Sequence, residues 1–412
     1  MTSRERILSA LNHKQPDRLP VDLGCHPSSG INVYAYINLR KYLGLEPRTI
    51  YMHDVVQQCV FPDDDILEMF GADAITLGRN FREDEGYWKG FSWPGGVDVK
   101  IPAFADVRYI GDDLWLYNSK GSPIGCRKST SPYIEQTVWP RAGDMSTDFS
   151  NLEDQLHEVL WFEIGWPPFP LGFEGDDLKK RIDTAKSLRD ETDKAVYTMF
   201  GGSTLDATQH VFRMDNALMH YALEPDLIRA FLENLLEIYM ENLKLCLDSC
   251  GDYIDILGFS DDLGMQTGPQ ISPEMYRDLF KPFHIALWGF VKKYKPHIKI
   301  KLHCCGGVEP LIRDLIDAGV DAINPVQISA AGMDLAKLKR EYGKDITFWG
   351  GGCDTQSVLP NASPQEVKDH VRRNIEVMFK DGGYVFQQVH NILHNIKPEN
   401  IVAMYEAVRE YQ

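Results

Sequence analysis

The sequence predicts an α/β protein of one domain, residues 1–412, built as a closed (β/α)8 barrel of the triosephosphate-isomerase type. Three observations predict this fold. Eight short apolar runs recur along the chain, most of them end in glycine or a turn, and helical patterns lie between most of them. The runs are continuously apolar rather than alternating, which is typical of parallel strands buried on both faces. The length of 412 residues alone suggests more than one domain, but α/β barrels regularly exceed the usual domain size.

Strands and helices are expected to alternate along the chain. The polar amphipathic segment 1–12 predicts a helix in which Thr2 and Ser3 act as caps. The expected strands are residues 18–24, 72–78, 195–202, 253–259, 298–303, 322–326, 346–351 and 384–389. The further expected helices are residues 35–43, 65–70, 217–248, 273–294, 308–318, 333–341, 364–380 and 398–410. A doubly wound open sheet is the alternative, but no glycine-rich phosphate loop follows the first run.

The stretch from about 80 to 175 breaks this alternation and predicts an insertion after the second strand. Residues 113–117 and 124–128 flank the turn 119–122, a pattern that predicts a β-hairpin. The stretch carries six tryptophans, which are Trp88, Trp93, Trp115, Trp139, Trp161 and Trp166. We expect the insertion to pack beside or over the barrel mouth, with its aromatic residues filling a small core. The alternative is that these residues line a substrate pocket.

The composition is that of an ordinary soluble globular protein, with 43% hydrophobic and 25% charged residues. The net charge of −17 argues against a nucleic-acid partner, because such proteins carry a basic footprint. No run approaches the ~18 apolar residues of a membrane span, and residues 1–12 lack the apolar core of a targeting peptide. The eight cysteines are expected to be reduced thiols or metal ligands. We therefore expect a cytoplasmic protein with no membrane partner.

The fifth predicted strand ends in a pair of metal-ligand residues. Its apolar run finishes at His303, continues through Cys304 and Cys305, and opens into Gly306 and Gly307. Side chains two residues apart on a strand share a face, so His303 and Cys305 are expected to point the same way and Cys304 the opposite way. An imidazole and a thiolate side by side are half of a zinc site. A third ligand has to come from elsewhere in the chain.

Two later strand ends offer that third ligand. Cys353 follows the seventh predicted strand and His390 follows the eighth. In a closed barrel the ends of all strands meet at one mouth, where function collects. Either residue completes a three-ligand site, or both complete a four-ligand site. Four protein ligands would make the site structural, whereas three would leave an open position and make it catalytic. The alternative for each residue alone is an ordinary place in the core.

The fourth predicted strand ends in paired acids, Asp261 and Asp262. Their simplest role is to cap the helix that follows. Paired acids at a barrel mouth can also accept a proton or bind a cationic group of a substrate, so both are candidate catalytic residues. Glycines at 201, 202, 306, 307 and 350–352 keep bulky side chains away from the same mouth.

The C-terminal half resembles the uroporphyrinogen decarboxylase superfamily. The segments that carry the resemblance are Asp261-Asp262-Leu263-Gly264, Ile271-Ser272-Pro273-Glu274-Met275-Tyr276, His303-Cys304-Cys305-Gly306, Gly350-Gly351-Gly352-Cys353-Asp354-Thr355-Gln356, Gly382-Gly383-Tyr384-Val385-Phe386, His390, and Pro398-Glu399-Asn400-Ile401. The resemblance is close over residues 250–412, looser over 1–80 and 190–250, and absent across the insertion. It implies the same barrel fold that the strand pattern predicts.

The decarboxylase branch of that superfamily works without metal or cofactor and binds its tetrapyrrole with an N-terminal arginine motif and an aspartate. Here the corresponding region, residues 20–27, reads Pro-Val-Asp-Leu-Gly-Cys-His-Pro and has no arginine. The aspartate expected after the second strand is also missing, since Leu77 and Gly78 lead into Arg79. We therefore do not expect porphyrinogen decarboxylation.

The second branch comprises corrinoid-linked methyltransferases, which bind zinc through His-x-Cys and a distant cysteine. His303 and Cys305 match the first two positions, whereas the last strand is followed by His390 instead of cysteine. The resemblance implies a zinc-dependent methyltransferase that moves a methyl group between a corrinoid on a carrier protein and a small acceptor (a thiol or tetrahydrofolate) or a methylated substrate. A metal-free decarboxylase and a non-catalytic corrinoid- or tetrapyrrole-binding protein are the alternatives. The substrate-binding residues are not identified, although the 80–175 insertion is expected to select the substrate.

Overall fold

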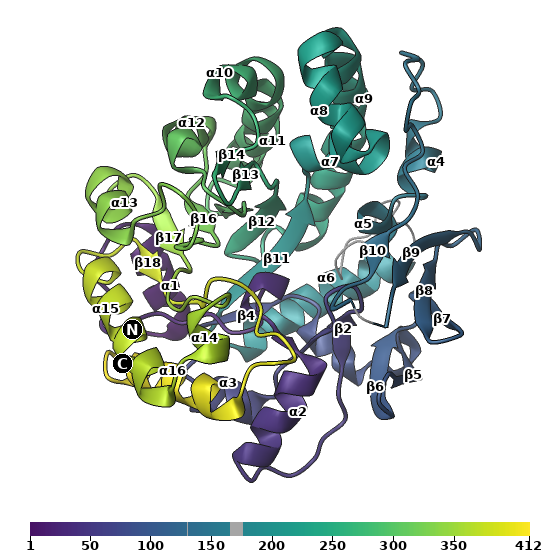
Figure 1. The fold of residues 1–412 in the computed structure, drawn as a ribbon. Helices are drawn as coiled ribbons and strands as arrows, with labels where there is room; N and C mark the ends of the chain where they lie inside the picture. The colour runs from purple at the N-terminus through teal and green to yellow at the C-terminus, as the bar shows by residue number, and fades with distance from the viewer. Residues whose placement is uncertain (130, 165–175) are drawn as a thin grey trace.

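The computed structural model describes residues 1–129, 131–164 and 176–412. Its centre is a curled sheet of seven parallel strands in the order β18-β17-β16-β15-β12-β11-β4. The strands are β4 (Ala74–Thr76), β11 (Ala195–Gly201), β12 (Ile256–Ser260), β15 (Lys299–His303), β16 (Ala322–Asn324), β17 (Thr347–Trp349) and β18 (Tyr384–Val385). Seven of the eight predicted strands are therefore present, and helices surround the sheet (Figure 1).

The first predicted strand fills the remaining gap between the two edges of this sheet. Val21 forms a parallel bridge with Phe386, next to β18. On its other side the Val21 carbonyl accepts a hydrogen bond of 2.8 Å from the Asp73 N–H, directly before β4. The Val21 N–H donates to the Asp73 carboxylate instead of to a strand carbonyl, so the ladder does not extend further. The predicted TIM-type barrel is confirmed, and the open-sheet alternative is wrong.

Helices cover the outside of the barrel, and the two chain ends lie close together (Figure 1). The helices are α1 (Ser3–Leu11), α2 (Val33–Tyr42), α3 (Asp64–Met69), α4 (Leu152–Leu156), α5 (Leu160–Glu163), α6 (Asp176–Glu191), α7 (Leu205–Phe212), α8 (Met214–Leu223), α9 (Pro225–Cys250), α10 (Pro273–Met275), α11 (Lys281–Tyr294), α12 (Ile312–Ala318), α13 (Leu335–Tyr342), α14 (Val358–Asn361), α15 (Pro364–Met378) and α16 (Pro398–Arg409). Within the described ranges, none of these helices has both the length and the apolar character that a membrane span requires.

Most predicted helices are present, with small shifts of their ends. Thr2 caps α1 and forms a reciprocal capping box with Glu5, whereas Ser3 is the first helical residue. The predicted helix 217–248 is two helices, α8 and α9, because the chain breaks at Glu224 and restarts at Pro225. Helices α4, α5, α6, α7 and α14 were not predicted.

Between β4 and β11 the chain leaves the barrel and forms small antiparallel sheets beside it (Figure 1). Strands β5 (Trp88–Trp93) and β6 (Val97–Pro102) pair with each other. A four-stranded sheet follows, formed by β7 (Asp106–Ile110), β8 (Asp113–Tyr117), β9 (Pro123–Arg127) and β10 (Glu135–Gln136). The predicted hairpin is the β8–β9 pair. A further small sheet near the N-terminus joins β1 (Ile31–Asn32), β3 (Cys59–Val60) and β2 (Met52–Asp54).

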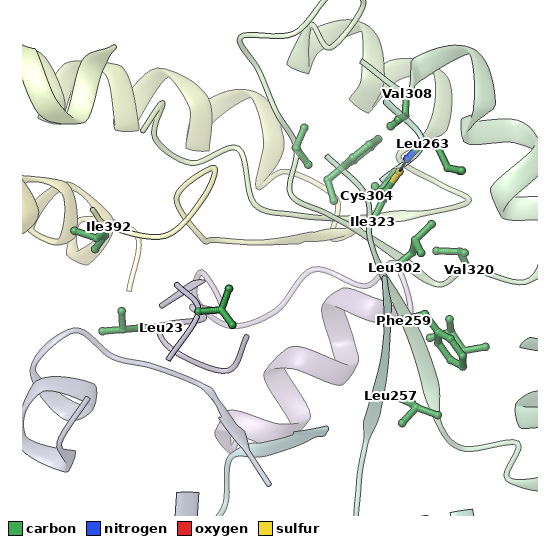
Figure 2. Close-up of a cluster of buried hydrophobic side chains, with 14 of the residues drawn as sticks. Leu23, Leu257, Phe259, Leu263, Leu302, Cys304, Val308, Val320, Ile323 and Ile392 are labelled. Atoms are coloured by element: carbon green, nitrogen blue, oxygen red, sulfur yellow. Dashed lines mark hydrogen bonds between the residues drawn. The ribbon is translucent and has the colours of Figure 1, made fainter. Parts of the chain in front are cut away.

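The barrel strands separate two buried layers. Side chains such as Leu257 on β12, Leu302 on β15 and Ile323 on β16 belong to the main hydrophobic cluster (Figure 2). Cys304 is fully buried in this cluster, and its sulfur accepts a hydrogen bond from the Leu263 N–H at 3.3 Å. The sequence predicted that Cys304 would point away from the His303 face of β15, and the burial of Cys304 among these residues agrees with that prediction.

Candidate metal centre

Three of the predicted ligand residues meet at the barrel mouth. The ligand atoms of His303, Cys305 and His390 all lie within 4.8 Å of one another, and we call these residues the ligand cluster. His303 ends β15, Cys305 follows two residues later, and His390 lies in the loop after β18. The Cys305 sulfur is 3.4 Å from His303 Nε2. Two imidazoles and one thiol form a donor set that suits zinc.

Amide side chains fix the orientation of both imidazoles. His303 Nδ1 lies 2.9 Å from the Asn324 side-chain oxygen, and His390 Nδ1 lies 2.7 Å from that of Asn391. An oxygen acceptor requires the proton on Nδ1, which leaves Nε2 as the atom available to a metal. Asn324 is itself held in place because its amide nitrogen donates to the Trp349 carbonyl at 2.8 Å. The cluster therefore has the outer hydrogen bonds that metal-binding histidines require.

The charge state of the cluster follows from its burial. Burial lowers the pKa of His303 to about 4 and also lowers the pKa of His390, so both rings are neutral near pH 7. A neutral imidazole is the form that binds a metal ion. Burial, together with the nearby Asp262 carboxylate, raises the pKa of the Cys305 thiol well above its usual value. The thiolate of Cys305 therefore needs a cation beside it, which is what a metal ion supplies.

Cys353, the other predicted candidate ligand, lies apart from the ligand cluster. It is fully buried in the main hydrophobic cluster, which also contains Tyr384 and Tyr405. Its sulfur contacts the Asp354 carbonyl, and burial raises the pKa of its thiol. The structure therefore brings His390, and not Cys353, to the His303–Cys305 pair.

The two predicted catalytic acids have different environments. Asp261 is fully buried and accepts hydrogen bonds from the backbone N–H groups of Leu205 and Asp206, at 3.0 and 2.8 Å. It therefore caps α7 instead of the helix that follows it in sequence. Burial acts to raise the pKa of Asp261, but the hydrogen bond and charge of His284, together with hydrogen bonds from the Asp206 backbone and the Thr204 side chain, keep the pKa below its usual value. Asp261 is an ionised structural group.

Asp262 lies next to the ligand cluster. One of its carboxylate oxygens accepts the Cys305 N–H at 2.7 Å and is 3.8 Å from His303 Nε2. Its side chain is partly exposed and lines the cavity at the barrel mouth. Asp262 can therefore exchange a proton with a molecule bound there.

Asp206 was not predicted as a site residue. It belongs to α7, lines the same cavity, and accepts the Asp262 N–H at 2.8 Å. Burial and the nearby carboxylates of Asp262 and Asp261 raise the pKa of Asp206 well above its usual value, which favours its protonated form. The sequence signal was present, because Asp206 closely follows the third predicted strand, but α7 itself had not been predicted.

His26 is a second residue that the sequence reasoning missed. It follows the first predicted strand and lines the cavity, with its ring centroid 4.8 Å from that of His303. Its Nδ1 accepts the Ser28 N–H at 3.1 Å. Burial lowers the pKa of His26 well below its usual value, so the ring is neutral.

A cavity of about 770 Å³ opens from the ligand cluster. Asp262, His303 and His390 are among its lining residues. The segment between β4 and β11 also contributes to the wall, through Trp139 and Trp161 among others. Both interpretations of the tryptophans in this segment therefore apply. Trp139 and Trp161 line a cavity, whereas Trp93 is buried in the core. Trp166 lies outside the described residues.

The same segment is joined to the loop that carries His390. The Tyr133 hydroxyl donates a hydrogen bond of 3.1 Å to the side-chain oxygen of Asn391, which also orients His390. Tyr133 itself lines the cavity. One polar contact thus links a wall of the cavity to the ligand cluster.

Fold and site together define an α/β-barrel protein with a His-Cys-His cluster at the mouth of the barrel. The family model for uroporphyrinogen decarboxylase (URO-D) matches residues 170–411, which is more than half of the chain. The chain therefore belongs to the uroporphyrinogen decarboxylase family.

Two curated relatives are both named uroporphyrinogen decarboxylase. The protein from Methylococcus capsulatus is 29% identical over 97 residues, which cover 24% of this chain and 26% of that protein. The protein from Pseudomonas fluorescens is 21% identical over 299 residues, which cover 65% of this chain and 78% of that protein. The chain thus spans about a quarter of the first relative and most of the second.

Among solved structures, a methyltransferase from Methanosarcina mazei is similar over the whole chain. The TM-score is 0.57 at 15% sequence identity, and the alignment covers 100% of this chain and 99% of that protein. A likeness at this identity shows that the two proteins share a fold.

Proposed function

We propose that this protein is a zinc-dependent methyltransferase that moves a methyl group between a corrinoid on a carrier protein and a small molecule. The small molecule is an acceptor such as a thiol or tetrahydrofolate, or a methylated substrate that is demethylated. The observation that carries the proposal is the ligand cluster of His303, Cys305 and His390, which opens into a cavity of about 770 Å³.

The number of ligands supports a catalytic site over a structural one. Structural zinc sites are closed by four protein ligands, whereas catalytic sites use three and leave a position for substrate. Here three side chains form the cluster, and two of them, His303 and His390, line the cavity. A zinc ion bound there would stabilise negative charge on the oxygen or sulfur of the substrate that gains or loses the methyl group.

The chain's own acids support the proton balance of such a transfer. In demethylation, the bond between the substrate heteroatom and the methyl carbon breaks, and its electron pair stays on the heteroatom. The methyl carbon forms its new bond with the electron pair of the reduced cobalt of the corrinoid. Asp206, which is favoured in its protonated form, can supply the proton that the heteroatom then takes up. In the opposite direction, Asp262 can accept the proton of a thiol.

The names of the curated relatives favour a metal-free decarboxylase as the second candidate. A porphyrinogen carries several carboxylates, and such a substrate requires cationic side chains in its site. No lysine is present among the described residues that line the cavity. Arg213 lines it, but its guanidinium is already paired with the Asp215 carboxylate, with Nε and Oδ1 2.6 Å apart. The charge of the cavity therefore favours methyl transfer over this candidate.

The test is an assay of methyl transfer to a reduced corrinoid, in which the absorbance change of the cobalt centre measures the transfer. We expect the untreated protein to be active, a chelator to abolish this activity, and added zinc to restore it. His303→Ala is expected to be inactive when untreated, after chelation and after addition of zinc. A metal-free lyase would keep its activity after chelation. A non-catalytic binding protein would change the corrinoid spectrum without turnover, and either result would refute the proposal.

A further inference from the structure

Aromatic side chains make up much of the cavity wall. They come from three separate parts of the chain, namely the segment between β4 and β11, strand β11 and helix α9. These side chains are Tyr133, Trp139, Trp161, Phe162, Phe200 and Tyr239. Aromatic rings on several sides of one cavity offer flat, apolar faces to whatever binds there.

Several of these rings are held in place by contacts with one another. Phe162 stacks on Tyr239 with the ring centroids 6.4 Å apart, and Phe200 contacts Tyr239 edge-on at 6.0 Å. The Tyr239 hydroxyl donates to the Ser203 carbonyl at 2.9 Å, which fixes the ring. On another part of the wall Trp161 stacks on His210 at 6.1 Å. The aromatic wall is therefore arranged before any ligand binds.

The polar groups around these rings do not suit an anionic ligand. Glu135 and Asp262 line the cavity, whereas Arg213, the one Lys or Arg among the described lining residues, is paired with Asp215. Burial lowers the pKa of His210 to about 4, so this ring adds no positive charge near pH 7. A substrate carboxylate would meet these acids, and the described lining residues include no unpaired Lys or Arg to offset its charge.

We propose that the cavity binds the small substrate through an uncharged single aromatic ring, with its methylated oxygen or sulfur directed toward the ligand cluster. This inference rests on the proposed methyl transfer and names the class of molecule that donates the methyl group. A cavity of about 150 Å³ is enough to hold benzene. A volume of about 770 Å³ therefore holds a substituted ring and leaves room for a group from the carrier protein.

The test compares matched ligands in calorimetric titrations of the full-length, zinc-free protein. Anisole and cyclohexyl methyl ether have the same heavy-atom skeleton but differ in aromaticity. We expect anisole to bind about tenfold more tightly, because favourable ring-to-ring contacts exist only for the aromatic ligand. We also expect 4-methylanisole to bind at least about tenfold more tightly than 4-methoxybenzoate, whose carboxylate meets the acids of the wall.

Variants locate the binding to the aromatic wall. Trp161 is 45% exposed, so Trp161→Leu is expected to fold normally and to lose most of the preference for anisole while binding cyclohexyl methyl ether within about twofold of wild type. Trp115→Leu is the control, because Trp115 lies on β8 in the same segment and is not part of the cavity wall. Equal affinity for the two ethers, no binding of either, or an unchanged preference in Trp161→Leu would overturn the inference.

One further variant separates this inference from the proposed function. His303→Ala removes a residue of the ligand cluster and leaves the aromatic wall intact, so its preference for anisole is expected to match that of wild type. Methyl transfer that shows no preference between aromatic and aliphatic methyl donors would overturn the inference and leave the proposed function standing. A ring preference in a protein that neither binds zinc nor transfers a methyl group would overturn only the proposed function.

Discussion

The loops after β15 and β17 both combine glycines with a cysteine, yet they place that cysteine in opposite environments. Cys305 reaches the barrel mouth, where its N–H is held by Asp262 and its sulfur lies beside His303. Cys353 is fully buried in the main hydrophobic cluster. The residue type and the position after a barrel strand are the same, so the difference must come from how each loop packs.

Glycines determine that packing. A Cβ atom on Gly306 would lie 2.3 Å from the Gly264 backbone, so the β15 loop presses against the chain that follows β12. A Cβ atom on Gly352 would lie 2.3 Å from the Phe386 ring, so the β17 loop presses against the chain that follows β18 instead. Each close approach requires glycine. The comparison teaches that a cysteine after a barrel strand is available to a metal only where the loop directs it to the mouth.

The largest expected effect separates the two cysteines by zinc content. Cys305→Ala removes one of the three proposed ligands, and we expect its zinc to fall from about one ion per chain to nearly none. Cys353→Ala is the matched control and is expected to keep its zinc. Elemental analysis of both purified variants measures their zinc content. Equal zinc contents would contradict the claim that only the loop after β15 supplies a metal ligand.

The histidines at the mouth allow the same comparison. His390→Ala is expected to lose zinc as Cys305→Ala does, because two remaining ligands do not hold the ion. His26→Gln should retain zinc, since His26 lies against His303 but is not a member of the ligand cluster. Zinc retained in His390→Ala and lost in His26→Gln would mean that the third ligand has been misassigned.

A smaller effect is expected from the amide that orients His303. Asn324→Leu removes the acceptor of the His303 Nδ1 hydrogen bond, and loss of such a partner weakens metal binding by about 10- to 100-fold. Asn400→Leu is the control, because Asn400 is equally buried but bonds the Leu359 carbonyl far from the mouth. Competition with a chromophoric chelator gives both zinc affinities. An unchanged affinity in Asn324→Leu would show that this hydrogen bond is not needed.

The smallest effect concerns stability in the absence of metal. Cys353→Ala leaves a small cavity in the core, and we expect a loss of about 1 kcal/mol in the free energy of unfolding. Cys305→Ala is expected to cost less, because Cys305 is partly exposed. Urea denaturation of both variants in a chelator compares them. A larger loss for Cys305→Ala would contradict the assignment of Cys353 to the core and Cys305 to the mouth.

The sequence predicts the barrel well because its strands are short, continuously apolar and separated by helices. Strand alternation is also local, so the opposite directions of His303 and Cys304 could be predicted. The first run, 18–24, was predicted as a strand but forms only a single bridge at Val21, because the Val21 N–H bonds the Asp73 side chain instead of extending a ladder. Helix α7 was not predicted, and with it the role of Asp206 was missed.

The choice between His390 and Cys353 could not be predicted from the sequence. It depends on contacts between loops that are distant in the chain, such as that of Gly352 with Phe386. Asp261 shows the same limit, because it caps a helix that precedes it by more than fifty residues instead of the one that follows it. Local patterns indicate which residues can bind or cap, and tertiary packing decides which of them do.

The most direct test of the metal centre is X-ray absorption at the zinc edge of the purified, zinc-loaded protein. The account predicts one sulfur ligand at about 2.3 Å and two imidazole nitrogens at about 2.0–2.1 Å, with one further position open to solvent or substrate. Cys305→Ala, which is expected to hold nearly no zinc, should give almost no zinc-edge signal, whereas Cys353→Ala is expected to keep the full signal with its one sulfur ligand. Two sulfur ligands in the wild type, or none, would contradict the assignment of His303, Cys305 and His390 as the ligand set.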